Sequence, residues 1–140
     1  MALDFQYDEL MLKRSNVRNV SAGDVVYGYE FSIRYPSYRG TFLSCIEGFR
    51  VFLDDKELSA ADLRFTLNGK QFLVSELGEL CHEYWYVLTD ASVTVLRLGG
   101  LPADAKELRV ELIHRVPYTG YFGEYLTLTS VGTLNIGGER

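Results

Sequence analysis

A strict alternation of residues between positions 25 and 35 limits the fold of this chain more than any other feature. Bulky side chains occupy every second position, from Val25 to Tyr35. A period of two places them on one face of a β-strand. Pro36 has no backbone N–H to donate to a ladder, so the strand ends there. The sequence therefore predicts a long strand, an exposed loop over 36–40 and a second strand over 42–53.

Short alternating runs separated by turns continue to the end of the chain. Further strands are expected at 17–20, 63–67, 71–74, 83–88, 92–98, 107–116 and 125–134, with turns at 21–24 and 54–56. Asn68-Gly69 is typical of a type I′ hairpin turn, because both residues tolerate positive φ angles. Strands with this spacing of turns predict an all-β fold, a single antiparallel β-sandwich of jelly-roll type.

Helix is expected at one place at most. Residues 75–82 are helix-like, with Ser75 as a potential N-cap, and Gly78 limits the segment to one or two turns. A length of 140 residues, 47% of them hydrophobic, suits one domain with a real core. We therefore predict a single β-sandwich domain over 1–140, in which 1–14 form an N-terminal arm.

Charge and hydropathy exclude several classes of protein. A net charge of −5 argues against binding to nucleic acid and to anionic membranes, which both need basic surfaces. No apolar run approaches the roughly 20 residues of a membrane span. The acidic first ten residues do not resemble a signal peptide. Cys45 and Cys81 leave the disulfide state open, and we expect a reducing cytoplasm.

The sequence offers no catalytic constellation. His114 lies on the apolar face of its strand, where a core or interface histidine is far more common than a ligand. Cys81 and His82 are adjacent, so their side chains diverge and suit one metal ion poorly. We expect no catalytic residue, cofactor or metal ligand in this chain. A glycosidase pair drawn from Glu76, Glu79, Glu83 or Asp8-Glu9 is weighed against a solvated acidic face, which we favour.

Two aromatic loops are the strongest candidates for a functional site in the sequence. The first holds Tyr35, Tyr38 and Arg39, and the second holds Tyr118, Tyr121 and Phe122. Aromatic residues and arginine beside Gly and Pro suit a protein interface or the rim of a ligand site. The alternative is a buried aromatic corner in which Arg39 pairs with a nearby acid. The residues alone leave both interpretations open.

The order of several short motifs resembles a known family, the β subunits of C-glycoside deglycosidases (C-deglycosylation enzymes). The matching segments are Ile33–Gly40, Leu43–Glu47, Val51–Asp55, Leu63–Lys70, Leu77–Leu80 before Glu83–Trp85, Gly99–Pro102 and Arg115–Tyr118. Each motif is weak alone, but their order is similar to the family's over about residues 15–130. Ser37 departs from the family pattern, so the class of aglycone stays open.

The resemblance implies a small β-sandwich subunit that supports a larger partner. That partner is an α subunit with a TIM barrel, which carries the acid and base residues and a divalent metal, typically manganese. The complex cleaves the carbon–carbon bond between a 3-oxo sugar and an aromatic aglycone such as a flavonoid. By this resemblance the aromatic loops would lie at the subunit interface or on the aglycone side of the pocket.

Two other functions remain to be weighed. A stand-alone carbohydrate- or polyphenol-binding β-sandwich would use the same aromatic residues as platforms that stack on ring faces. An enzyme acting alone would use the acidic residues, and turnover by the single purified chain would be needed to support it.

Overall fold

The computed structural model describes Leu12 and residues 17–37, 39–116 and 126–136. The five-stranded sheet has the order β1 (Arg18–Ala22), β2 (Val25–Arg34), β9 (Asp90–Leu96), β6 (Leu63–Leu67), β7 (Lys70–Leu73). The four-stranded sheet has the order β11 (Leu126–Asn135), β10 (Glu107–Val116), β4 (Ile46–Leu53), β5 (Lys56–Glu57). A two-stranded ribbon joins β3 (Thr41–Phe42) to β8 (Tyr84–Trp85). All of these pairs are antiparallel, which confirms the predicted all-β class.

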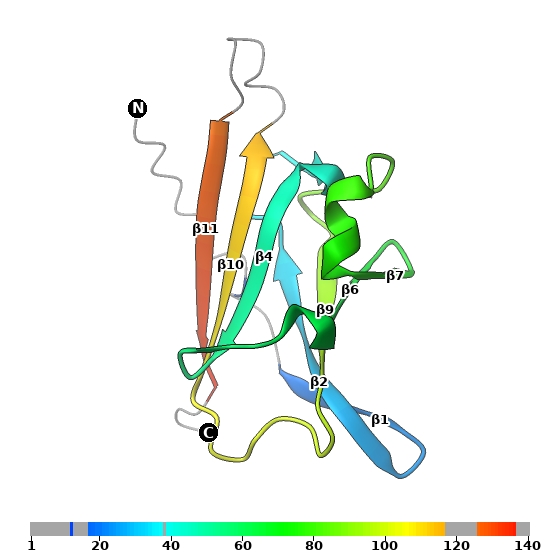
Figure 1. Cartoon of the computed structure of the whole chain (residues 1–140), viewed down its shortest axis with the longest axis vertical. Helices are drawn as coiled ribbons and strands as arrows, with labels where there is room; N and C mark the ends of the chain where they lie inside the picture. Colours follow the sequence, from blue (N-terminus) through cyan, green and yellow to red (C-terminus); the bar gives the residue numbers. More distant parts are fainter. Residues whose placement is uncertain (1–11, 13–16, 38, 117–125, 137–140) are drawn as a thin grey trace.

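The two larger sheets pack face to face around one core. Figure 1 shows β11, β10 and β4 as one layer, with β2 and β9 in the layer behind it. Phe49 of β4 meets Phe65 of β6 edge to face, with ring centroids 5.6 Å apart. Leu12 is buried in the same core, whereas 1–11 and 13–14 of the expected arm lie outside the described residues. The core therefore fills the space between the sheets, as in a sandwich.

The alternation in β2 predicts which side chains are buried over only part of the strand. Tyr29, Phe31 and Ile33 are buried between the sheets, but Val25 and Tyr27 are exposed. Figure 1 shows why: the β1–β2 hairpin extends beyond the end of the four-stranded sheet, so nothing in that sheet covers its first residues. The periodicity identified the face, while the facing sheet determines how much of that face is buried.

Tight turns hold the hairpins. Asn68 and Gly69 have φ angles of 55° and 77°, which confirms the predicted hairpin between β6 and β7. Asp54 and Asp55 also have positive φ angles, in the turn between β4 and β5. The Asp54 carboxylate accepts the backbone N–H groups of Lys106 and Glu107 at 2.9 Å each. These bonds hold the pKa of Asp54 below its usual value and tie the turn to β10.

Two predicted boundaries were wrong. The strand expected over 42–53 is broken by a 3₁₀ turn, η1 (Leu43–Cys45), because Ser44 N–H bonds to the Leu80 carbonyl instead of a neighbouring strand. The helical piece is a 3₁₀ helix, η3 (Val74–Glu79), and Ser75 lies inside it. Its first turn is stabilised by the Glu76 carboxylate, which accepts the Leu73 N–H at 2.7 Å. A third short 3₁₀ turn, η2, spans Ala60–Asp62.

Two further observations concern the cysteines and the helices. Cys45 is buried and Cys81 is exposed, and both are free thiols. Within the described ranges, no helix has the length and apolar character needed to cross a bilayer.

Candidate binding surface

The strands that lead into the two predicted aromatic loops end beside each other. Tyr35 directly follows β2, and His114 is near the end of β10. The Tyr35 hydroxyl lies 2.6 Å from His114 Nδ1, in a hydrogen bond that crosses from one sheet to the other. β2 and β10 therefore finish at the same end of the sandwich, which we call the loop end.

A buried polar chain stabilises the loop end. His114 is fully buried, and its Nε2 lies 3.0 Å from Ser130 Oγ of β11. A neutral imidazole donates at one ring nitrogen and accepts at the other, so Tyr35 and Ser130 satisfy both nitrogens. Burial lowers the pKa of His114 to about 4, because the charged form would lose its hydration. The interpretation of His114 as a satisfied core residue is confirmed.

Tyr35 is part of this core instead of an exposed loop. It is 3% exposed, and its ring centroid is 5.2 Å from that of Trp85. Trp85 is itself buried and donates its indole N–H to the Thr89 carbonyl at 2.8 Å. For Tyr35, the buried aromatic corner is therefore the better description in this chain.

The other predicted site residues divide into two groups. Arg39 is exposed and lies two residues before β3 of the ribbon. The remaining four lie outside the described residues: Tyr38, Tyr118, Tyr121 and Phe122. Their assignment to an interface or a substrate rim stays a prediction.

An exposed aromatic surface lies on the ribbon beside Arg39. Thr41 pairs with Trp85 on the buried face, and Phe42 pairs with Tyr84 on the opposite face. The ring centroids of Phe42 and Tyr84 are 5.0 Å apart, and those of Tyr84 and Tyr86 are 4.7 Å apart. We call Phe42, Tyr84 and Tyr86 the aromatic ladder. Phe42 is 42% and Tyr86 is 62% exposed, which is unusual for such large apolar groups.

Several contacts fix the position of this ladder. Asn68 at the β6–β7 turn donates its side-chain N–H to the Tyr84 carbonyl at 3.0 Å. Gly40 packs so closely that a Cβ there would overlap the Trp85 carbonyl oxygen and touch the Tyr84 ring. Leu43 N–H bonds to the Glu83 carbonyl at 2.8 Å. The ladder is thus held by backbone contacts on both of its strands.

Sequence reasoning missed the ladder as a unit. The signal was present in Tyr84-Trp85-Tyr86, where a period of two buries the middle ring and exposes its neighbours. Phe42 could not be added to the group from the sequence, because its pairing with Tyr84 joins segments far apart in the chain.

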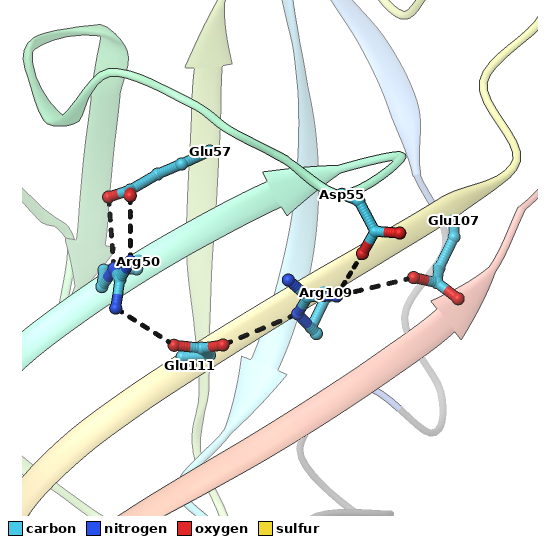
Figure 2. Close-up of polar contacts among 6 residues, drawn as sticks. All are labelled: Arg50, Asp55, Glu57, Glu107, Arg109 and Glu111. Carbon is cyan, nitrogen blue, oxygen red and sulfur yellow. Dashed lines mark hydrogen bonds and ion pairs between the residues drawn. The ribbon is translucent and has the colours of Figure 1, made fainter.

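The outer face of the four-stranded sheet has a different character. Arg50 pairs with Glu57 at 3.0 Å and with Glu111 at 3.4 Å (Figure 2). Arg109 pairs with Asp55 at 2.6 Å and with Glu111 at 3.6 Å. The hydrogen bonds from Arg50 keep the pKa of Glu57 below its usual value. We call this set of pairs the ion lattice.

The ion lattice also covers the apolar group beneath it. The guanidinium carbons of Arg50 and Arg109 lie 5.1 Å and 4.4 Å from the centroid of the Phe52 ring. Such cation–π contacts and stacked arginine stems shield an aromatic ring from water. Phe52 and the charged side chains of the ion lattice therefore find their partners within the chain.

Two of the acidic residues considered for a glycosidase pair, Glu76 and Glu83, have structural partners, whereas Asp8 and Glu9 lie outside the described residues. Glu83 pairs with Lys70 at 2.7 Å, and this contact holds the pKa of Glu83 below its usual value. Glu76 caps the first turn of η3. Across the part of the chain that the structure describes, no group of three or more His, Cys, Asp or Glu side chains is placed to hold a metal ion.

The fold and this surface define a small all-β protein that presents ordered aromatic side chains at one end. A model of the family described as C-glycoside deglycosidase beta subunit matches residues 7–118. The chain belongs to this family of C-glycoside deglycosidase beta subunits.

Individual relatives agree with this assignment. A 3′-dehydrocarminate deglycosidase beta subunit from a Microbacterium species is 36% identical over 103 residues, covering 72% of this chain and 76% of the relative. A C-glycoside deglycosidase beta subunit from Eubacterium cellulosolvens is 25% identical over 103 residues, covering 73% and 70%. Another from Microbacterium trichothecenolyticum is 37% identical over 87 residues, covering 61% and 65%.

Proposed function

We propose that this chain is the small β subunit of a heteromeric C-glycoside deglycosidase. The observation that carries the proposal is the family match over residues 7–118, which spans most of both sheets. The exposed aromatic ladder supports it, because rigid aromatic groups of this kind are enriched at protein interfaces. In this proposal the chain stabilises a larger α subunit with a TIM barrel, and the catalytic residues belong to that partner.

The reaction we propose for the complex is an elimination from a 3-oxo-C-glycoside. The 3-keto group acidifies the proton on C2, and a base of the α subunit removes it. A C1–C2 double bond forms as the bond from C1 to the aglycone breaks, and the aglycone carbon takes up the electron pair and a proton. A divalent metal in the α subunit, with manganese as the first candidate, would stabilise the enediolate.

Co-expression tests the subunit assignment. The chain is produced with a neighbouring barrel-like reading frame and examined by native mass spectrometry. We expect a mixed complex, with cleavage of a 3-oxo-C-glycoside that stops after chelation and needs both chains. A chain that stays monomeric beside a folded barrel would contradict the proposal. We place the complex in the cytoplasm, in keeping with the two free thiols.

A stand-alone carbohydrate- or polyphenol-binding module is the second candidate. It is favoured by the exposed rings of Phe42 and Tyr86, which could contact a flat ligand. Trp85 is the single tryptophan and belongs to the same ribbon as the ladder, so a ligand that shifts the ribbon would change its fluorescence. Titration of the isolated chain with a flavonoid C-glucoside would show saturable binding if this second function holds.

A further inference from the structure

Two apolar patches are exposed at opposite ends of the described structure. The aromatic ladder lies at the loop end, beside the buried Tyr35. Val25, Tyr27 and Leu98 are exposed at the other end, where Leu98 follows β9 and Val25 begins β2. Between them, the ion lattice of Figure 2 leaves the outer face of β4 and β10 charged and internally paired. We compare these two ends as candidates for an interface.

The geometry of the ladder favours a protein over a sugar. Its neighbouring rings are nearly perpendicular, at 77° between Phe42 and Tyr84 and 70° between Tyr84 and Tyr86. A sugar platform needs a flat ring face open to the ligand, whereas tilted rings form ridges that fit into recesses of another protein. The hydroxyl groups of the two tyrosines can also bond to carbonyl groups at the rim of such a recess.

The ladder is also organised before it binds. Backbone pairing of β3 with β8, the Asn68 bond to the Tyr84 carbonyl and the close approach of Gly40 hold its backbone in place. Binding through groups that are already ordered loses little conformational entropy. The other patch lies partly on the β1–β2 hairpin, which extends beyond the facing sheet (Figure 1). Of the two patches, the aromatic ladder at the loop end is therefore the one whose backbone is better ordered before a partner binds.

We infer that the aromatic ladder is the surface through which this chain binds the larger deglycosidase subunit. The inference rests on the proposed function and adds the residues of the contact. Phe42 and Tyr86 insert into an apolar recess of the partner, and Tyr84 supports both rings from between them. The occupant is the partner subunit, and a second copy of this chain is the outcome that the test separates from it.

Single substitutions at the ladder test the inference. Phe42→Ser and Tyr86→Ser each remove an exposed ring and leave the buried face of the ribbon intact. Binding of each variant to the co-expressed barrel subunit is measured by biolayer interferometry. We expect the Kd to rise at least about tenfold for each variant, as is usual for aromatic residues at the centre of an interface. Thermal unfolding of each isolated variant checks that its fold is retained.

Leu98→Ser provides the matched control. Leu98 is 79% exposed and lies at the opposite end, so this change should alter the Kd by less than about twofold. If the Leu98 variant loses binding and the ladder variants do not, the interface is at the other end and the inference is wrong. The inference would also be wrong if the ladder variants and the Leu98 variant all bound the barrel subunit with the same Kd.

The outcomes also separate this inference from the proposed function. If the wild-type chain forms no mixed complex, the subunit assignment itself fails, and the contact residues fail with it. If the wild-type complex forms and the ladder variants assemble normally, only the ladder assignment fails. A homodimer in native mass spectra that Tyr86→Ser abolishes would make a second copy the occupant, against the inference.

Discussion

Tyr29 and Tyr35 are both buried tyrosines, but their hydroxyl groups have different surroundings. The Tyr29 hydroxyl is buried and has no hydrogen-bond partner among the described residues, and burial raises its pKa to about 12. The Tyr35 hydroxyl bonds to His114. An unpaired buried polar group is costly, whereas removal of a bonded one leaves its partner unsatisfied.

Replacing each tyrosine with phenylalanine should therefore have opposite effects. We expect Tyr29→Phe to raise the free energy of unfolding by about 1 kcal/mol, and Tyr35→Phe to lower it by about 1–3 kcal/mol. Urea unfolding of the two variants measures both values. A loss of stability in the Tyr29 variant would show that its hydroxyl has a partner in solution.

The buried His114 should make folding sensitive to mild acid. Its folded pKa of about 4 is below the ordinary value of 6.5, so the unfolded chain binds the proton more readily between these values. Stability is therefore fully present above about pH 6.5 and falls as the pH decreases towards 4. The expected loss is about 2 kcal/mol at pH 5 relative to pH 7.5.

Chemical unfolding at several pH values measures this dependence. His114→Gln removes the titrating group and keeps a polar side chain, so its stability should change less between pH 7.5 and 5. The carboxylates with lowered pKa values, Asp54, Glu57 and Glu83, lose their contribution only at lower pH. An unchanged pH profile in the His114 variant would assign the effect to another group.

At the scale of elements, local pattern predicted the strands and long-range contacts determined their ends. The alternation over 107–116 and the Asn-Gly turn at 68–69 agree with β10 and the β6–β7 hairpin. The break at η1 could not be predicted, because it depends on hydrogen bonds from Leu43 and Ser44 to Glu83 and Leu80. The start of η3 was missed for a related reason, since its capping group is a side chain inside the turn.

The ribbon of β3 and β8 depends on close backbone packing at Gly40. Gly40→Ala places a methyl group against the Trp85 carbonyl oxygen, so the ribbon must shift. We expect a loss of about 1–3 kcal/mol in the free energy of unfolding, together with weaker partner binding through the displaced ladder. Differential scanning calorimetry measures the stability change.

Gly78→Ala is the control for this substitution. A Cβ at Gly78 meets no atom within 4 Å, and its φ is not positive. The stability of this variant should stay the same or rise slightly, because alanine restricts the unfolded chain. Equal effects of the two alanine variants would mean that crowding at Gly40 is not the cause.

At the scale of the whole molecule, the sequence predicted two aromatic loops at the surface. In the structure Tyr35 of the first loop is buried and Arg39 is exposed, and the aromatic residues of the second loop lie outside the described residues. The strand ends before both loops meet through Tyr35 and His114, which no local pattern could show. Tyr35 is buried because it packs on Trp85, a residue fifty positions further along the chain. The exposed aromatic surface arises instead on the ribbon, where two distant segments pair.

Assembly should be visible as a change in stability. A partner that binds only the folded chain stabilises it by mass action, by about 2.7 kcal/mol when its free concentration is 100 times the Kd. We therefore expect the midpoint of thermal unfolding of this chain to rise with added α subunit. Tyr86→Ser should need a higher concentration of the partner for the same shift. A midpoint that does not change at saturating partner would contradict the proposed complex.

The placement of the two cysteines has a practical consequence. Cys45 is buried, and Cys81 is exposed between Leu80 and Glu83, whose carbonyl groups accept hydrogen bonds from η1 beside Phe42. A maleimide dye would therefore attach selectively to the native Cys81 thiol, with no engineered residue. The emission of that dye would report, in real time, the approach of a second protein to the ladder.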